Sequence, residues 1–148
     1  MTQSRIHGSL HLSPASLDMM ETELLSGRCA CGQTVFEVRA ATASAVCYCD
    51  TCRRVSGGLG MAWVDGKRSS LSMHGPVSRW RSSTHAYRHF CAVCGTHLLL
   101  IEDAGGDSVE IAIGALEQQS LLSVDHESHV ASRPAWVETR ARAQRDSS

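Results

Sequence analysis

The chain has 148 residues and a mass of 16.0 kDa, which suits one domain with one buried core. Hydrophobic residues make up 43% and charged residues 20%, a composition typical of a folded protein and not of a disordered one. The formal net charge of -1 gives no reason to expect nucleic acid or an anionic membrane as a partner. No apolar run approaches the roughly 18 residues that span a bilayer. No secretory signal is recognisable, so a cytoplasmic protein is expected.

The first part of the chain is expected to hold a short helix. Ser13 is a suitable N-cap, Pro14 a suitable first helical residue, and Gly27 a suitable residue just past the end. The apolar positions that repeat at helical spacing are Leu17, Met20 and Leu24. These signals together predict one helix that ends before Gly27.

Beyond residue 30 the sequence predicts strands and no long helix. Apolar and polar residues alternate along 34–39, 59–64 and 108–113, and 98–101 is a short apolar run suited to a buried strand. Turns that contain glycine or proline separate these segments. We therefore expect a mainly β domain with an antiparallel sheet, the short helix at its N-terminus, and a charged, solvated tail from residue 138.

Cysteine provides the strongest functional signal in the chain. The seven cysteines fall in three tight groups: Cys29 and Cys31; Cys47, Cys49 and Cys52; Cys91 and Cys94. Clustered cysteines in a chain that is expected to stay reduced are typical of metal ligands. Buried inert thiols would not produce such close spacing in every group.

Two of the groups share a feature that predicts a common metal site. Cys31 and Cys94 are each followed by a glycine, and Gly32 and Gly95 can take a positive φ that turns backbone N–H groups toward thiolate sulfur. We therefore predict one closed, structural site of four thiolates, formed by Cys29, Cys31, Cys91 and Cys94. Such a site would fasten the start of the β domain to its middle.

The remaining group is Cys47, Cys49 and Cys52, and Arg53 follows it in place of a glycine. Three ligands within six positions can bind one tetrahedral ion and leave its fourth position open, which is the pattern of catalytic zinc. Thiolate-rich tetrahedral sites favour zinc, and an iron–sulfur cluster or a thiol–disulfide pair is a weaker alternative. His97 and His129 are both candidates for a fourth ligand, and their positions do not decide between them.

These motifs resemble those of the glutathione-dependent formaldehyde-activating enzyme family. The resemblance extends from Gly27 to about Val137, and all seven cysteines fall on family positions. Its landmarks here are residues 27–32, 47–54, 90–96 and 114–117, then His129 and residues 134–136. One position departs from the family pattern, because Tyr48 stands where the family usually has His between the first two cysteines of the second group.

The resemblance implies an Mss4-like β fold and two zinc ions per chain, one structural and one catalytic. The implied zinc-binding domain is 27–137, between an N-terminal extension, 1–26, and the charged tail, 138–148. In the founding activity of the family, the thiol of glutathione adds to formaldehyde, and the reverse reaction breaks a carbon–sulfur bond. A carbon–sulfur lyase that acts on glutathione and a small aldehyde is therefore implied.

Residues near the second group are candidates for substrate binding: Arg53, Arg54, Tyr48, Ser56 and Gly57. A guanidinium binds a carboxylate at two points, and glutathione carries two carboxylates. Arg79, Arg81 or Arg88 would receive the substrate if the first two arginines do not. Two other functions stay open, namely a glutathione carrier without catalysis and a structural zinc module that binds a protein partner. A second zinc closed by histidine would favour the module.

Overall fold

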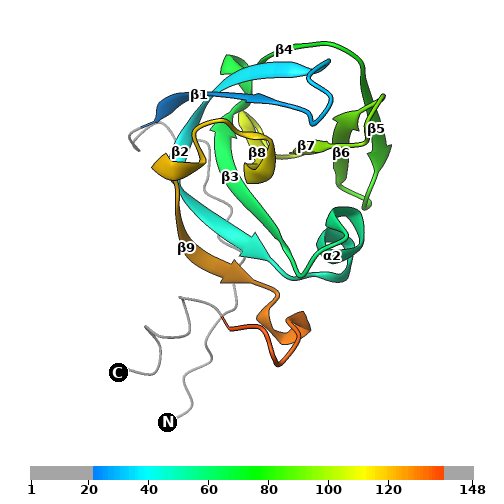
Figure 1. Ribbon diagram of the computed structural model, residues 1–148, viewed down its shortest axis with the longest axis vertical. Coiled ribbons are helices and arrows are strands. Elements are labelled where there is room, and N and C mark those ends of the chain that lie inside the picture. The colour runs from blue at the N-terminus through cyan, green and yellow to red at the C-terminus, as the bar shows by residue number, and fades with distance from the viewer. Residues whose placement is uncertain (1–21, 139–148) are drawn as a thin grey trace.

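The structure is a computed structural model, and it describes residues 22–138. Its nine strands form one sheet in the order β1-β2-β3-β8-β7-β6-β5, with β4 and β9 each paired to β2 (Figure 1). The strands are β1 (Glu23–Arg28), β2 (Val35–Cys47), β3 (Met61–Lys67), β4 (Ser72–His74), β5 (Val77–Arg81), β6 (Ala86–Cys91), β7 (His97–Glu102), β8 (Ser108–Ala112) and β9 (Ser123–Ser128). The α-helix within this part of the chain is α2 (Asp50–Ser56). Four short 3-10 turns are η1 (Arg68–Ser70), η2 (Ile113–Ala115), η3 (Gln119–Leu121) and η4 (Val130–Ser132).

The sheet confirms the prediction of a mainly β, antiparallel fold. The segments predicted at 34–39, 59–64, 98–101 and 108–113 correspond to parts of β2, β3, β7 and β8. β2 is longer than predicted, since it continues to Cys47 and pairs with four different strands. β9 runs parallel to β2, whereas the other strand pairs are antiparallel.

The predicted N-terminal helix is wrong over its last residues. Leu24 and Gly27 lie in β1, where they pair with Arg39 and Phe36 of β2. Gly27 does not end a helix. A glycine is required there by packing, because a Cβ atom at this position would collide with the Phe36 ring. The rest of that helix, from Ser13, lies outside the described residues, as does the charged tail after residue 138.

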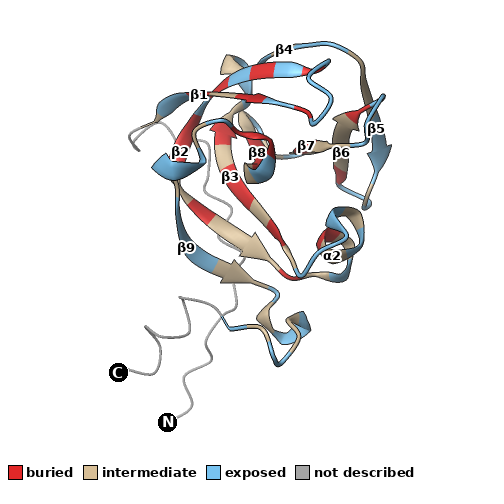
Figure 2. Cartoon of the chain, viewed as in Figure 1, coloured by how far each residue is buried: buried red, intermediate tan, exposed pale blue. Residues whose placement is uncertain are grey.

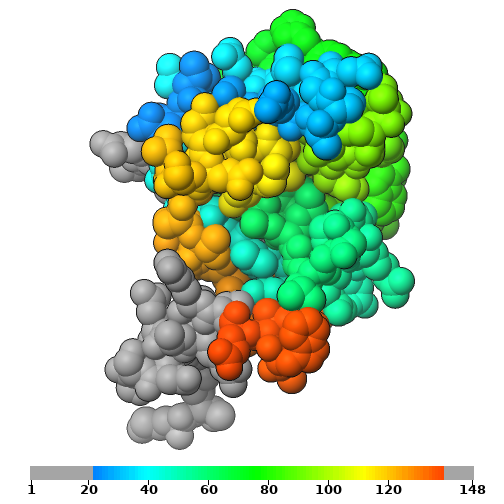
Figure 3. Space-filling view, in the orientation of Figure 1, coloured from blue at the N-terminus to red at the C-terminus, as the bar shows by residue number. Residues whose placement is uncertain are grey.

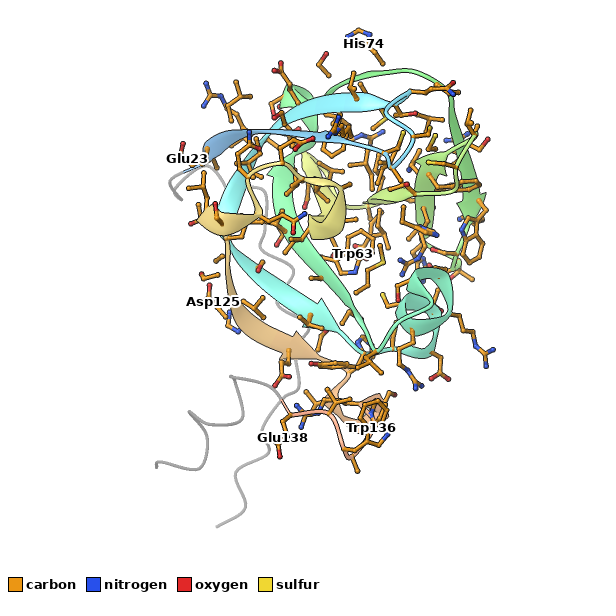
Figure 4. The ribbon with its side chains drawn as sticks, in the orientation of Figure 1. Glu23, Trp63, His74, Asp125, Trp136 and Glu138 are labelled. Atoms are coloured by element: carbon orange, nitrogen blue, oxygen red, sulfur yellow. The ribbon has the colours of Figure 1, made fainter. Side chains whose placement is uncertain are left out.

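Two apolar clusters form the interior, and the smaller one positions α2. The larger cluster packs β1 and β2 against β7 and β8, as the buried segments in Figure 2 indicate. The smaller cluster joins α2 to β3, β6, β7 and β8 through Cys52, Met61, Trp63, Ala86, Leu100 and Ala112. Figure 4 shows Trp63 projecting from β3 toward α2 and β6. A cysteine of the second group is thus part of the hydrophobic interior.

Within residues 22–138, no helix has the length and hydrophobicity to cross a membrane.

Candidate metal centres

The structure brings the first and third cysteine groups together. The four Sγ atoms of Cys29, Cys31, Cys91 and Cys94 all lie within 4.8 Å of one another, with two of the residues buried and two exposed. The Sγ atoms of Cys29 and Cys31 are 3.4 Å apart, and those of Cys31 and Cys91 are 3.8 Å apart. Thiolates on one tetrahedral zinc, each about 2.3 Å from the ion, are about 3.8 Å from each other. The donor set and its spacing therefore fit a closed four-thiolate site.

The two halves of this first cluster form similar turns. In each half a glycine N–H donates a hydrogen bond that closes the turn. Gly32 N donates to Cys29 O at 3.0 Å, and Gly95 N donates to Cys91 O at 2.9 Å. Gly32 and Gly95 both have a φ of 76°, so the predicted positive φ is confirmed at both positions. The N–H of Thr34 donates to Cys29 Sγ at 3.2 Å. The bond from Thr34 stabilises negative charge on the Cys29 sulfur, as a metal-bound thiolate requires, whereas the two glycine bonds hold the turns.

Thr96 links the halves of the first cluster. Its hydroxyl accepts a hydrogen bond from Ala30 N at 3.0 Å and lies 3.1 Å from Cys94 Sγ. The hydrogen bond from this hydroxyl, supported by the backbone N–H of Thr96, lowers the pKa of Cys94 to about 5. A pocket of about 400 Å³ lies beside the cluster, between the Cys29–Gly32 turn and residues 114–117.

The second cluster forms where β2 passes into α2 (Figure 1). Cys47 ends β2, Cys49 is the N-cap of α2, and Cys52 lies in the first turn of that helix. Cys49 has an extended backbone, and its Sγ accepts a hydrogen bond from Cys52 N at 3.3 Å, as an N-cap side chain does. The helix ends at Ser56, and the φ of 64° at the following Gly57 is typical of a C-terminal cap. The end of β2 and the first turn of α2 together bring the three thiols to one point.

The geometry of the second cluster fits a metal ion with one position left over. The Sγ atoms of Cys47, Cys49 and Cys52 all lie within 4.8 Å of one another, and within residues 22–138 no further Cys, His, Asp or Glu joins this set. The hydrogen bond between Cys47 and Cys52 lowers the pKa of Cys47 to about 4, whereas the same bond and burial raise the pKa of Cys52. One thiol of the group therefore ionises readily and is suited to bind a cation.

A buried arginine that the cysteine motifs did not single out contacts the second cluster. Arg88 is 4% exposed, and its Nη2 donates to Cys52 Sγ at 3.3 Å. Its guanidinium carbon lies 5.3 Å from the centroid of the Trp63 ring, and its Nε is buried without a hydrogen-bond partner. A buried cation is costly unless negative charge compensates it. Its contact with sulfur therefore indicates that the second cluster is anionic.

The sequence contains only a weak signal for Arg88, which it predicts as one of three alternative receptors for the substrate. It lies three residues before Cys91, on the face of β6 that also carries the buried Ala86. An arginine between apolar strand positions on the inward face is unusual, and its alternation with Ala86 is the pattern that would have indicated burial.

The other predicted substrate residues surround α2 in different ways. Arg53 and Arg54 lie in the last turn of the helix, where Arg53 pairs with Asp50 and Arg54 is exposed. Ser56 is occupied within the turn that follows, since its hydroxyl donates to Gly60 O at 3.2 Å and accepts from Gly58 N at 3.1 Å.

Tyr48 contacts β9 and the segment that follows it. It is 3% exposed, and its hydroxyl donates to Glu127 Oε1 at 3.0 Å. The same oxygen of Glu127 pairs with Arg133 at 3.0 Å, with the Glu127 side chain 1% exposed. This side chain, predicted as a substrate-binding candidate, therefore packs between β2 and the end of β9.

The histidines differ in their distance from the second cluster. His129 Nδ1 lies 3.5 Å from Cys47 Sγ, so this histidine reaches the cluster. His97 instead contacts Phe90, with ring centroids 6.0 Å apart, and its Nδ1 is buried without a partner. Burial, followed by the charge of Arg88, lowers the pKa of His97. Of the two candidates for a fourth ligand, the structure brings His129 to a cysteine.

The chain is similar to proteins of one family. A family described as "Glutathione-dependent formaldehyde-activating enzyme" matches residues 24–132. A Halomonas elongata protein described as "Putative glutathione-dependent formaldehyde-activating enzyme" is 29% identical over 133 residues, which are 82% of this chain and 84% of that protein. A crystal structure of a Rhodobacter sphaeroides protein superposes with a TM-score of 0.56 at 21% identity, covering 70% of this chain and 99% of the other. The last similarity concerns the fold alone.

Proposed function

Because the chain belongs to the family of glutathione-dependent formaldehyde-activating enzymes, we propose that it catalyses the reversible addition of glutathione to a small aldehyde. In the forward direction a bond forms between the thiol sulfur and the carbonyl carbon, and the thiol proton ends on the former carbonyl oxygen. In the reverse direction the carbon–sulfur bond breaks, which makes the protein a carbon–sulfur lyase. The proposal assigns it to the cytoplasm, where thiols stay reduced.

The observation that carries the proposal is the difference between the two cysteine clusters. The first cluster consists of four thiols. The second cluster consists of three thiols and is contacted by a buried arginine. We propose one zinc ion at each, because thiolate-rich tetrahedral donor sets favour zinc. At the second site the metal would supply a position at which the glutathione thiol is held as a thiolate.

The side chains around the second cluster have separate tasks in this proposal. Arg88 offsets part of the negative charge of the cluster, so that a further thiolate can approach. Trp63 and Met61 belong to the apolar wall behind Cys52, which excludes water from that side. In the proposal, Arg54 at the exposed end of α2 pairs with a glutathione carboxylate, and Arg53 can do so if it leaves Asp50.

Exchange spectroscopy by NMR tests the proposed reaction. Free aldehyde and its glutathione adduct give separate signals, and their interconversion rate is measured with and without the protein. The protein should accelerate the interconversion, and Cys52→Ser should not. If the intact protein binds glutathione but leaves the rate at its uncatalysed value, it is a carrier and not a lyase.

A second function is favoured by one contact. If His129, 3.5 Å from Cys47 Sγ, permanently completes the second site, both clusters are closed and the protein is a structural zinc module for a protein partner. Glutathione would then bind to neither metal. Calorimetric titration of the zinc-loaded protein with glutathione separates the two functions, since only the lyase and the carrier give a binding isotherm.

A further inference from the structure

The distance between His129 and Cys47 is one that two ligands of the same metal ion have. A tetrahedral zinc with a sulfur about 2.3 Å away and a nitrogen about 2.0–2.1 Å away separates these two atoms by about 3.6 Å. The observed distance between Cys47 Sγ and His129 Nδ1 is 3.5 Å. This spacing is that of two atoms bound to the same ion.

The backbone at His129 is held in an unfavourable conformation. Its φ of 54° and ψ of 42° lie in the left-handed region, and it is the one non-glycine residue with positive φ within residues 22–138. Such a conformation persists only where surrounding contacts hold it, and it is common at functional sites. This turn directs the imidazole back toward the end of β2.

Contacts on both sides of His129 hold this turn against β2. On the N-terminal side, Ser128 pairs with Cys47, and Ser128 O accepts a hydrogen bond from Tyr48 N at 3.1 Å. The buried Glu127 carboxylate accepts from the Tyr48 hydroxyl and pairs with Arg133 on the C-terminal side of the turn. Figure 3 shows the segment after β9 lying next to the α2 region of the surface. Residues 127–133 are therefore fastened to the segment that carries two of the cysteines.

We propose that His129 is an exchangeable fourth ligand of the second metal site, which glutathione thiolate displaces. This inference rests on the proposed function, because it assumes a metal at Cys47, Cys49 and Cys52. His129 lies close to Cys47 but outside the set of sulfur atoms that are all within 4.8 Å, so the imidazole must turn to complete the coordination. It is also exposed to solvent, into which it can be released.

Exchange is consistent with the chemistry of the ligands. Glutathione thiolate replaces a neutral imidazole, so the charge of the site becomes more negative by one, and the buried guanidinium of Arg88 offsets this change. The four-cysteine site has no such neutral ligand. The network of Tyr48, Glu127 and Arg133 acts at a distance from the metal and positions the turn that carries His129.

The coordination can be observed directly in protein loaded with cadmium-113 and labelled with nitrogen-15 histidine. A correlation between cadmium and one imidazole nitrogen is expected in the free protein, and it should disappear in His129→Ala. It should remain in His126→Ala, the matched control, because His126 is an exposed histidine on β9. Addition of glutathione should remove the correlation.

The same variants give a second readout by calorimetry. If the closed form accounts for about nine-tenths of the free protein, His129→Ala should bind glutathione about tenfold more tightly, because no internal ligand competes. The absence of a cadmium–histidine correlation in the free protein overturns the inference, even if glutathione binds normally. A correlation that survives saturation with glutathione overturns the exchange. If glutathione does not bind to the wild type at all, the proposed function fails and the correlation alone reports on His129 as a ligand.

Discussion

Replacement of Arg88 should weaken metal binding at the second cluster without affecting the first. The side chain is 4% exposed and donates to Cys52 Sγ at 3.3 Å, so solvent screens this contact little. A hydrogen bond that involves a charged group contributes about 1.5–3 kcal/mol. Loss of it in Arg88→Met should therefore lower the zinc affinity of the second site about ten- to a hundredfold.

The assay is competition for zinc with a chromophoric chelator, which resolves a weak site from a strong one. Arg88→Lys keeps the charge but loses the planar guanidinium, and it should give an intermediate affinity. Arg79→Met is the matched control, because Arg79 is an exposed arginine on β5 whose guanidinium lies over the Tyr87 ring. Circular dichroism verifies that each variant is folded. Equal second-site affinities in Arg88→Met and Arg79→Met would refute the idea that Arg88 compensates the charge of the thiolates.

Three further outcomes are expected. Cys94→Ser should unfold or lose much of its stability, because the binding energy of a structural zinc is folding energy. Cys52→Ser should instead stay folded with one zinc fewer. Thermal denaturation and metal analysis would show both results. Arg54→Ala should weaken glutathione binding about tenfold but leave binding of mercaptoethanol unchanged by calorimetry, since only glutathione has carboxylates to pair. Burial, then the charges of Arg79 and Arg68, lowers the pKa of His89 below 6.5 in the folded protein. The unfolded chain thus takes up a proton first, so stability should fall as the pH drops below about 6.5, and urea denaturation of His89→Gln should show a smaller fall.

The parts of the site that depend on local spacing could be predicted from the sequence. Cys31 and Cys94 are each followed by a glycine, and both glycines adopt the positive φ that the turn requires. Such turns depend on adjacent residues only, so the sequence motif determines them. The strand alternation at 108–113 likewise predicted β8 to within one residue.

Features that depend on distant contacts were missed or wrong. Leu24 was predicted as helix because its spacing from earlier apolar residues suits one, but pairing with β2 makes it part of a strand. The helix α2 was not predicted, since it has only seven residues and its N-cap is Cys49 and not one of the usual capping residues. The sequence named both His97 and His129 as candidates for a fourth ligand but could not decide between them, because the proximity of His129 to Cys47 depends on the parallel pairing of β9 with β2, across 82 positions of sequence.

Native mass spectrometry of the protein with glutathione tests the central claim most directly, namely that the cysteines form one closed and one thiol-accepting zinc site. The account predicts a chain that carries two zinc ions and one glutathione in the wild type, and one zinc ion without glutathione in Cys52→Ser. A wild-type chain with a single zinc ion, or with glutathione attached as a disulfide in place of the second zinc, would contradict it.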